Sequence, residues 1–329
     1  MSLLLENFDF IRPTNLEQLK SLVRKYDEQG QSYSFSAGGT NIIPKLKTQI
    51  VTLDKLISLG GLPELNLIEK HGNRIIIGAL TTLSHLATSD IIQKYLPCLR
   101  HAAHKVASPQ IRNRATIGGN VMVDNRCIYI NQSRLNRECH TPCFKADGDV
   151  CHLVKSARRG DDILCQARFV SDTAPVLLLL EAKINITGPD GTRTIKLAEL
   201  YRQDGIDSKS LKQGELITSF DIEIPENSRL HYEKLTIRNA LDFPSLGVAV
   251  KLNGQNLSAA LTGLNTLPGI FDAKGDDYDS FEDMVDHICG QASDFAKTYQ
   301  QDFFPRAYRK NMIPVFIRRG IDNILKDHP

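Results

Sequence analysis

The cysteines of this chain are gathered into one segment that lacks regular periodicity. Five of the seven lie between Cys127 and Cys165, and the residues from Arg126 to Arg168 follow neither the alternation of a strand nor the 3.6-residue period of a helix. Charged residues surround these cysteines, so burial in a hydrophobic core does not account for them. We therefore expect residues of about 126–168 to form an inserted loop around a metal centre, with regular structure before and after it.

The ligands in this segment suit more than one metal. The five cysteines are Cys127, Cys139, Cys143, Cys151 and Cys165. Four thiolates can hold zinc or an iron–sulfur cluster, and the lack of paired Cys-x-x-Cys knuckles favours the cluster over structural zinc. Reduced thiols without a metal are the third possibility. His140 and His152 are available as substitute ligands, although a histidine beside a metal loop is more often a bystander.

Two glycine pairs precede the cysteine-rich segment. They are found in Ala37-Gly38-Gly39-Thr40-Asn41 and Thr116-Ile117-Gly118-Gly119-Asn120. Glycine lets backbone amides approach phosphate oxygens, and a helix that follows adds favourable partial charge at its N-terminus. A tight turn without a ligand is the simpler interpretation of either pair alone. Neither pair has the Gly-x-Gly-x-x-Gly or Gly-Lys-Ser/Thr order of the common nucleotide motifs, so the sequence does not support a Rossmann or P-loop assignment.

The flanking segments predict both helices and strands. Thr14 with Glu17 forms a candidate capping box, and apolar residues at helical spacing follow it. A glycine turn between Leu65–Glu69 and Arg74–Ile77 predicts a hairpin, as does Asn253-Gly254 further along. Together these patterns predict an α+β fold.

Two domains are expected from the change in pattern near Pro225. Strand-like runs dominate from 231 to 262, and helical spacing follows from 281 to 325. We expect a two-part domain over residues 1–222, into which the cysteine-rich loop is inserted, and a mixed sheet-and-helix domain over residues 223–329.

Composition excludes several classes of partner. The net charge of +2 is the small difference between 40 basic and 38 acidic residues, without a polybasic arm, so nucleic acid is not an expected partner. The chain contains no run of about 18 or more apolar residues, which is the length needed to span a membrane. The N-terminal residues do not resemble a signal peptide, which makes a cytoplasmic location the expectation.

The glycine pairs, the cysteine-rich loop and a charged segment with Lys234 together resemble the FAD-binding medium subunits of the xanthine oxidase and carbon monoxide dehydrogenase superfamily, over the whole chain. The resemblance implies a two-part FAD-binding domain of the PCMH type, followed by a domain like the C-terminal part of the carbon monoxide dehydrogenase flavoprotein. It also implies a set of cofactor-binding residues. These are Ala37, Gly38, Gly39, Thr40, Asn41, Thr82, Thr116, Ile117, Gly118, Gly119, Asn120, Asp172 and Lys234.

The resemblance gives these residues different roles. The four glycines would let the backbone approach the FAD pyrophosphate, while Thr40, Thr116, Asn120 and Asp172 would supply hydrogen bonds. Lys234 would lie near the flavin and influence its potential; from the residues alone, Lys234, Arg238 and Asp242 indicate only a solvated charged face. Asn41 replaces an acidic residue that the family often has.

Within this superfamily, the cysteine-rich loop resembles that of 4-hydroxybenzoyl-CoA reductase beta subunits. The resemblance implies a four-iron four-sulfur cluster, with ligands in the same order. The implied ligands are Cys127, Cys143, Cys151 and Cys165. The interval from Cys151 to Cys165 is longer than is usual there, and Cys139 is an extra candidate.

The resemblance implies an electron-transfer subunit. A large partner subunit would hold the molybdenum cofactor and a small partner subunit two two-iron clusters, in a heterotrimer or its dimer. Electrons would flow from ferredoxin through this chain to a molybdenum site that reduces an aromatic CoA thioester. The alternative is a xanthine dehydrogenase-like complex that passes electrons outward to NAD or another acceptor. A zinc-stabilised binding module without enzymatic activity is a third, remote alternative.

Overall fold

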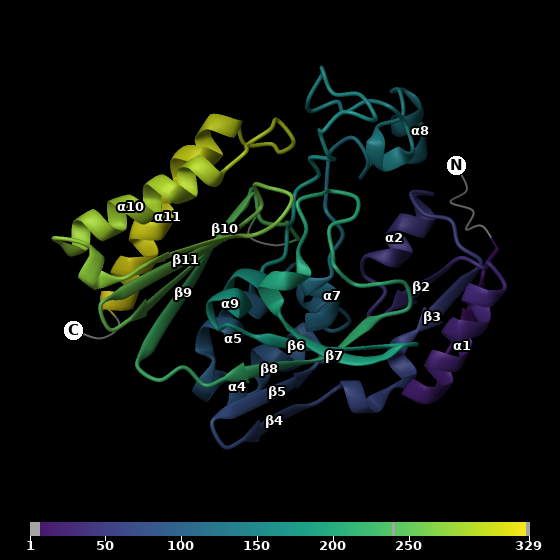
Figure 1. Cartoon of the computed structure of the whole chain (residues 1–329), viewed down its shortest axis with the longest axis horizontal. Helices are drawn as coiled ribbons and strands as arrows, with labels where there is room; N and C mark the ends of the chain where they lie inside the picture. The colour runs from purple at the N-terminus through teal and green to yellow at the C-terminus, as the bar shows by residue number, and fades with distance from the viewer. Residues whose placement is uncertain (1–6, 239–240, 327–329) are drawn as a thin grey trace.

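Three sheets organise the computed structural model, which describes residues 7–238 and 241–326 (Figure 1). The first sheet is small and parallel, in the order β1-β3-β2. Its strands are β1 (Asp9–Ile11), β2 (Tyr33–Ser36) and β3 (Lys55–Ser58). Two helices accompany them, α1 (Leu16–Glu28) and α2 (Ile42–Lys47). The glycine segment around Gly38 therefore connects a strand to a helix.

The first helix begins one residue later than the capping box predicted. Asn15 is the N-cap, and its side chain accepts a hydrogen bond from the backbone amide of Gln18 at 2.8 Å. Gln18 in turn accepts from the backbone amide of Thr14 at 2.7 Å. The side chains of Asn15 and Gln18 thus satisfy the amides at the start of the helix, and the prediction of a capping box with Thr14 and Glu17 was wrong.

The second sheet is antiparallel, in the order β4-β5-β8-β6-β7. Its strands are β4 (Ile68–His71), β5 (Arg74–Gly78), β6 (Lys183–Gly188), β7 (Gly191–Lys196) and β8 (Leu216–Glu223). The hairpin of β4 and β5 confirms the sequence prediction. Pairing of β5 with β8 joins parts of the chain that precede and follow the cysteines, so both parts build one sheet.

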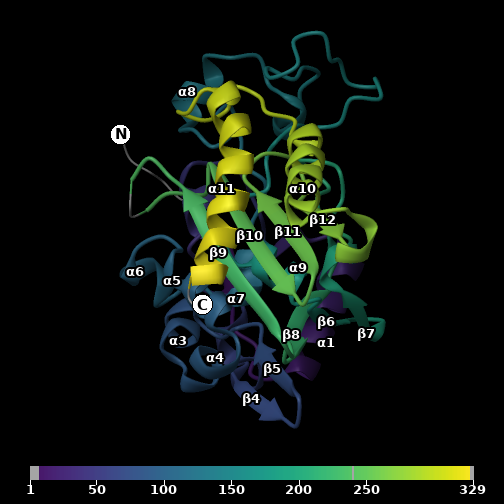
Figure 2. The ribbon, with the colours of Figure 1, turned by 90° about the vertical axis from the view of Figure 1, so that its left-hand side faces the viewer.

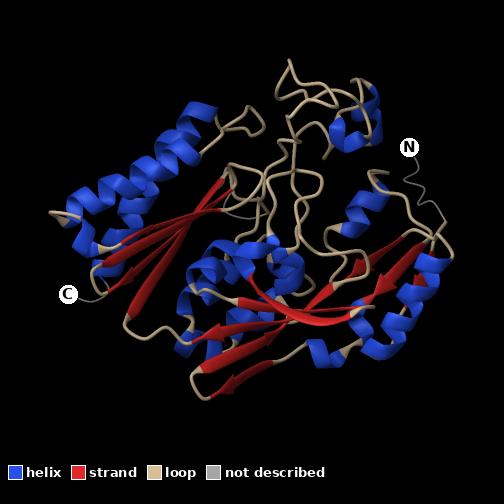
Figure 3. Cartoon of the chain, in the orientation of Figure 1, coloured by secondary structure: helices blue, strands red, loops and turns tan. Residues whose placement is uncertain are grey.

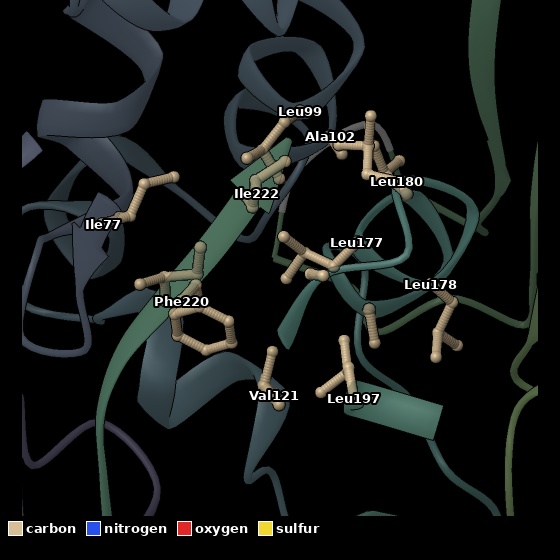
Figure 4. Packing of buried hydrophobic residues seen from close by; sticks show 14 of the residues in the cluster. Ile77, Leu99, Ala102, Val121, Leu177, Leu178, Leu180, Leu197, Phe220 and Ile222 are labelled. Atoms are coloured by element: carbon tan, nitrogen blue, oxygen red, sulfur yellow. The ribbon is translucent and has the colours of Figure 1, made fainter. Parts of the chain in front are cut away.

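Helices cover this second sheet. They are α3 (Leu83–Thr88), α4 (Asp90–Tyr95), α5 (Pro97–His104), α6 (Pro109–Arg112), α7 (Ile117–Val121) and α9 (Ala174–Leu179). In the core, Phe220 and Ile222 of β8 face Leu177 of α9 and Val121 of α7 (Figure 4). All four side chains are buried. This packing holds α9 and α7 against the sheet, and residues of α7 border the candidate site.

The third sheet is an antiparallel meander, in the order β12-β11-β10-β9. Its strands are β9 (Ser228–Leu235), β10 (Leu246–Asn253), β11 (Asn256–Thr262) and β12 (Gly269–Ala273). Two helices, α10 (Phe281–Phe295) and α11 (Arg306–Lys326), lie on one face of this sheet (Figure 2). The strands β9 to β11, the hairpin at Asn253-Gly254 and the α+β class confirm the sequence predictions, although β12 was not anticipated.

The cysteine-rich segment, residues 126–168, is joined to the rest of the fold where its two ends pair with each other. Arg126 and Arg168 exchange two backbone hydrogen bonds, at 2.8 and 2.9 Å. Between them the chain is mostly irregular and contains the short helix α8 (Arg134–Glu138), as Figure 3 shows above the sheets. Among the described residues, no helix is both long and apolar enough to cross a membrane.

Candidate functional site

A cleft of about 430 Å³ lies between the first and second sheets, and both glycine segments line it. This volume is within the usual range for small-molecule and cofactor sites. The wall is largely apolar, with Phe35, Leu216 and Phe243 among its residues, and it carries the polar side chains of Lys45 and Asp124. An elongated cofactor with apolar rings and a charged linker matches such a lining.

The first glycine segment contributes unpaired backbone donors. Within the described ranges, 7–238 and 241–326, no group accepts a hydrogen bond from the amides of Gly38, Gly39, Thr40 or Asn41. Gly39 has a φ of 75°, a conformation that favours glycine, and α2 begins directly afterwards. Successive free amides ahead of a helix form an anion-binding concavity.

The second glycine segment has a different structure from the turn that its sequence suggested. Helix α7 begins at Ile117, and the Thr116 hydroxyl caps it by accepting from the Gly119 amide at 3.0 Å. The Ile117 amide donates to the carbonyl of Thr81, and the Gly118 amide donates to that of Ala79, each at 3.0 Å. The amides of Ile117, Gly118 and Gly119 are therefore already paired, and Gly118 permits close packing against Ala79.

Thr82 and Asn120 have structural partners in this region. Thr82 caps α3 by accepting from the His85 amide at 3.1 Å, and it is not among the residues that line the cleft. Asn120 does line the cleft, but its Oδ1 atom accepts from the hydroxyls of Ser171 and Thr173, both at 2.7 Å, and from the Thr173 amide. Asn120 therefore joins the end of α7 to the start of α9.

Asp172 and Lys234 form a buried ion pair outside the cleft lining. Asp172 Oδ1 lies 2.9 Å from Lys234 Nζ and accepts a hydrogen bond from the Tyr232 hydroxyl, also at 2.9 Å. The side chains of Asp172 and Lys234 are only 3% and 5% exposed. Burial raises the pKa of Asp172, and the ammonium of Lys234 and the Tyr232 hydroxyl offset this only in part.

Lys234 also holds backbone that borders the cleft. Its Nζ atom donates to the carbonyls of Lys105 at 3.1 Å and Asp242 at 2.8 Å. Val106 and Phe243, the residues that follow these carbonyls, both line the cleft. The Lys234 side chain thus does not line the cleft itself but holds two backbone segments next to residues that do.

The four cysteines expected as ligands lie around one small cavity of about 20 Å³. Cys127, Cys143, Cys151 and Cys165 all line it. Cys139 does not, since it is exposed and its thiol donates to the carbonyl of Leu135.

The chemistry of this cavity fits a metal centre. Burial raises the pKa of Cys127 to about 11 and that of Cys165 to about 12, so metal binding has to displace protons there. Lys145 also lines the cavity and supplies positive charge beside the sulfurs. No three His, Cys, Asp or Glu side chains in the described part of the chain are placed to hold a single metal ion.

The cysteine-rich segment is attached to the helix that follows the first glycine segment. Arg137 donates to the carbonyl oxygens of Thr48 at 3.0 Å and Gln49 at 2.8 Å, at the end of α2. Figure 1 shows α8 beside α2. At the narrow attachment itself, the Arg126 guanidinium lies 4.3 Å from the centre of the Phe243 ring, which lines the cleft.

Three charged residues that the sequence did not single out connect the cleft to the cysteine cavity. Asp124 accepts from Lys45 and from Lys145, each at 2.7 Å. Asp124 and Lys45 line the cleft, whereas Lys145 lines the cysteine cavity. The sequence held no signal for this set, since neither spacing nor a motif relates Lys45 to Lys145.

Comparisons with known proteins agree with this geometry. A family model described as the FAD binding domain in molybdopterin dehydrogenase matches residues 6–227. The carbon monoxide dehydrogenase medium chain of Afipia carboxidovorans is 29% identical over 265 residues, covering 79% of this chain and 75% of that one. The aldehyde oxidoreductase FAD-binding subunit of Escherichia coli is 31% identical over 227 residues, covering 65% and 69%. In fold, this chain resembles a chain of reconstituted CO dehydrogenase from Oligotropha carboxidovorans, with a TM-score of 0.74 over 98% of both chains and 24% identity.

Proposed function

This chain belongs to the family of FAD-binding domains of molybdopterin dehydrogenases, and we propose that it relays electrons between FAD in the cleft and an iron–sulfur cluster on four cysteines. As a family member it is an oxidoreductase subunit of a molybdenum hydroxylase-type complex. The main support for this relay is that Asp124 accepts hydrogen bonds from a lysine that lines the cleft and from a lysine that lines the cysteine cavity.

The cleft supports FAD binding through the backbone of its first glycine segment. The free amides of Gly38 to Asn41 would donate to the pyrophosphate, and Lys45 on the same side of the cleft would add positive charge. Gly118 and Thr116 would act by shaping the wall, because their hydrogen bonds go to protein. When bound, FAD can exchange two electrons with one partner and single electrons with iron–sulfur clusters.

The residues outside the cleft lining would act on the cofactor indirectly. Thr82 and Asn120 would hold the starts of α3 and α9, and the pair of Asp172 with Lys234 would hold the wall segments that carry Val106 and Phe243. In this proposal Lys234 influences the flavin through the backbone that it positions.

The cysteine cavity supports a four-iron four-sulfur cluster through its donor set. Four thiols line one cavity, as the cluster requires, and Lys145 would offset the negative charge that a thiolate-bound cluster carries. Since four sulfurs around a cluster need not approach a single point, the set does not depend on a site for one metal ion. Cys139, which lies outside the cavity, would not be a ligand.

We propose the partners and the direction of electron flow by analogy with the family. A large subunit would hold molybdenum and the substrate, and a small subunit would hold two-iron clusters. Inward flow from ferredoxin would reduce an aromatic CoA thioester, as in 4-hydroxybenzoyl-CoA reductases. In the alternative, outward flow would serve a hydroxylase that delivers electrons to NAD or another acceptor. Turnover with ferredoxin and with NAD, assayed separately, distinguishes the two.

Metal and flavin content test the cofactor assignment. The complex is purified anaerobically, and iron, acid-labile sulfide, zinc and released flavin are measured per subunit. One FAD and about four irons and four sulfides beyond those of the small subunit are expected. Flavin with zinc instead of the extra iron would contradict the cluster and keep the flavoprotein. Colourless protein with stoichiometric zinc would instead support a non-enzymatic binding module.

A further inference from the structure

Asp124 lines the cleft and accepts hydrogen bonds from one lysine of the cleft and one lysine of the cysteine cavity. Its Oδ2 atom accepts from Lys45 Nζ and its Oδ1 atom from Lys145 Nζ, each at 2.7 Å. The two lysines come from different parts of the chain, Lys45 from α2 and Lys145 from the cysteine-rich segment. With one carboxylate between two ammonium groups, the set carries one net positive charge.

All three side chains are largely removed from solvent. Asp124 is 24% exposed, Lys45 17% and Lys145 10%. Burial acts to raise the pKa of Asp124, but the charges of Lys145 and Lys45 together hold it below its usual value. The charges are therefore fixed, and because water screens them little, they interact more strongly with nearby charges than surface ion pairs do.

Lys145 is further constrained by the backbone. Lys145 also donates to the carbonyl of Gly205 at 2.5 Å. Gly205 lies directly against Cys165, because a Cβ atom added at this glycine would be 2.7 Å from the Cys165 sulfur. The ammonium of Lys145 is therefore held close to the wall of the cysteine cavity.

We propose that Lys45, Asp124 and Lys145 form a charge bridge. Together they set the reduction potential of the FAD in the cleft and that of the cluster on the cysteines. The inference rests on the proposed function, since it requires both cofactors. Reduction adds negative charge, so a fixed cation beside a redox centre makes that centre easier to reduce and a fixed anion makes it harder. Each lysine is expected to act mainly on the centre whose wall it lines, and Asp124 on both.

The signs of the shifts test this bridge. In the anaerobic complex, Lys145→Met should lower the potential of the cluster more than that of the flavin, and Lys45→Met should do the reverse. Asp124→Asn removes a negative charge and should raise both potentials. The potentials are read from a redox titration followed by the visible spectrum of the flavin and the electron paramagnetic resonance of the cluster. A merely structural role would not produce shifts of opposite sign.

Two controls keep the test decisive. Lys145→Arg retains the positive charge and should keep both potentials close to those of the unaltered complex. Lys20→Met removes a lysine whose partner is Glu17 on the exposed side of α1, and should change neither potential. Unshifted potentials in Asp124→Asn and Lys145→Met complexes that hold full flavin and iron would overturn the bridge and leave the proposed function intact. Absence of the additional iron from the unaltered complex would overturn both.

Discussion

Gly38 lies directly against the backbone carbonyl of Arg114. A Cβ atom built on Gly38 would be 1.8 Å from the Arg114 oxygen, so no side chain fits there. Arg114 stands two residues before the Thr116 cap of α7, so the first glycine segment packs directly against the backbone that leads into the second. Their shared position at the cleft depends on this close approach.

Replacement of Gly38 by alanine should therefore disrupt the cleft. We expect Gly38→Ala to lose most of its bound FAD and to lower the thermal midpoint, because the backbone of one segment has to move. Gly290→Ala is the matched control, since nothing lies within 4 Å of its added Cβ inside α10. It should retain FAD and gain about 0.5–1 kcal/mol of stability. A Gly38→Ala protein with full FAD and an unchanged midpoint would contradict the contact.

Removal of the Asn120 side chain should destabilise the junction of α7 and α9. Asn120→Ala leaves the hydroxyls of Ser171 and Thr173 without their acceptor, at a cost of about 1–3 kcal/mol. Asn120→Asp keeps the accepting oxygen and should lose less. Urea unfolding of flavin-free protein measures both variants. Equal stability of the alanine variant and the unaltered chain would limit Asn120 to a role in cofactor binding.

Loss of Lys234 should destabilise the fold in a pH-dependent way. Lys234→Met leaves Asp172 buried without its cation, which costs about 3–5 kcal/mol when the carboxylate is ionised. The folded pKa of Asp172 is already above its unfolded value, and loss of Lys234 raises it further. Stability that depends on protonated Asp172 is present at low pH and lost as pH rises through the folded pKa. The loss should therefore be smaller at pH 5 than at pH 7.5.

Urea unfolding at both pH values measures this dependence, with a matched pair of controls. The double variant Asp172→Asn with Lys234→Met has no buried charge at this place and should show little dependence on pH. Lys20→Met breaks an exposed pair and should change the stability little at either pH. A Lys234→Met loss that is the same at both pH values would show that Asp172 does not carry the effect.

Replacement of a cysteine should reduce the iron content only where that cysteine lines the cavity. Cys143→Ser removes a thiol from the cavity wall and should lose most of the additional iron and acid-labile sulfide, while retaining FAD. Cys139→Ser is the matched control, since it lies on the surface of the same segment and should keep the iron. Iron lost from the Cys139→Ser protein and kept in the Cys143→Ser protein would reverse the assignment.

The sequence alone predicted the features that depend on near neighbours along the chain. The hairpin of β4 and β5 and the helices α10 and α11 follow from periodicity and turn residues, which act over a few positions. The clustering of five cysteines marked the segment, and the four of them that the family resemblance implied as ligands do line one cavity. Local signals were insufficient where alternatives differ by a single residue, as for the N-cap of α1, or where glycine suits both a turn and a helix start, as in α7.

Only the tertiary structure decided which distant residues meet. The pairing of β5 with β8, the burial of Asp172 against Lys234 and the link from Lys45 through Asp124 to Lys145 all join positions far apart in the sequence. Such contacts form because packing the whole core brings their backbones together, and no local preference of either residue encodes the partner. The sequence by itself determined which glycines and thiols the chain contains, while the packed core determined that Asp124 links a lysine of the cleft to a lysine of the cysteine cavity.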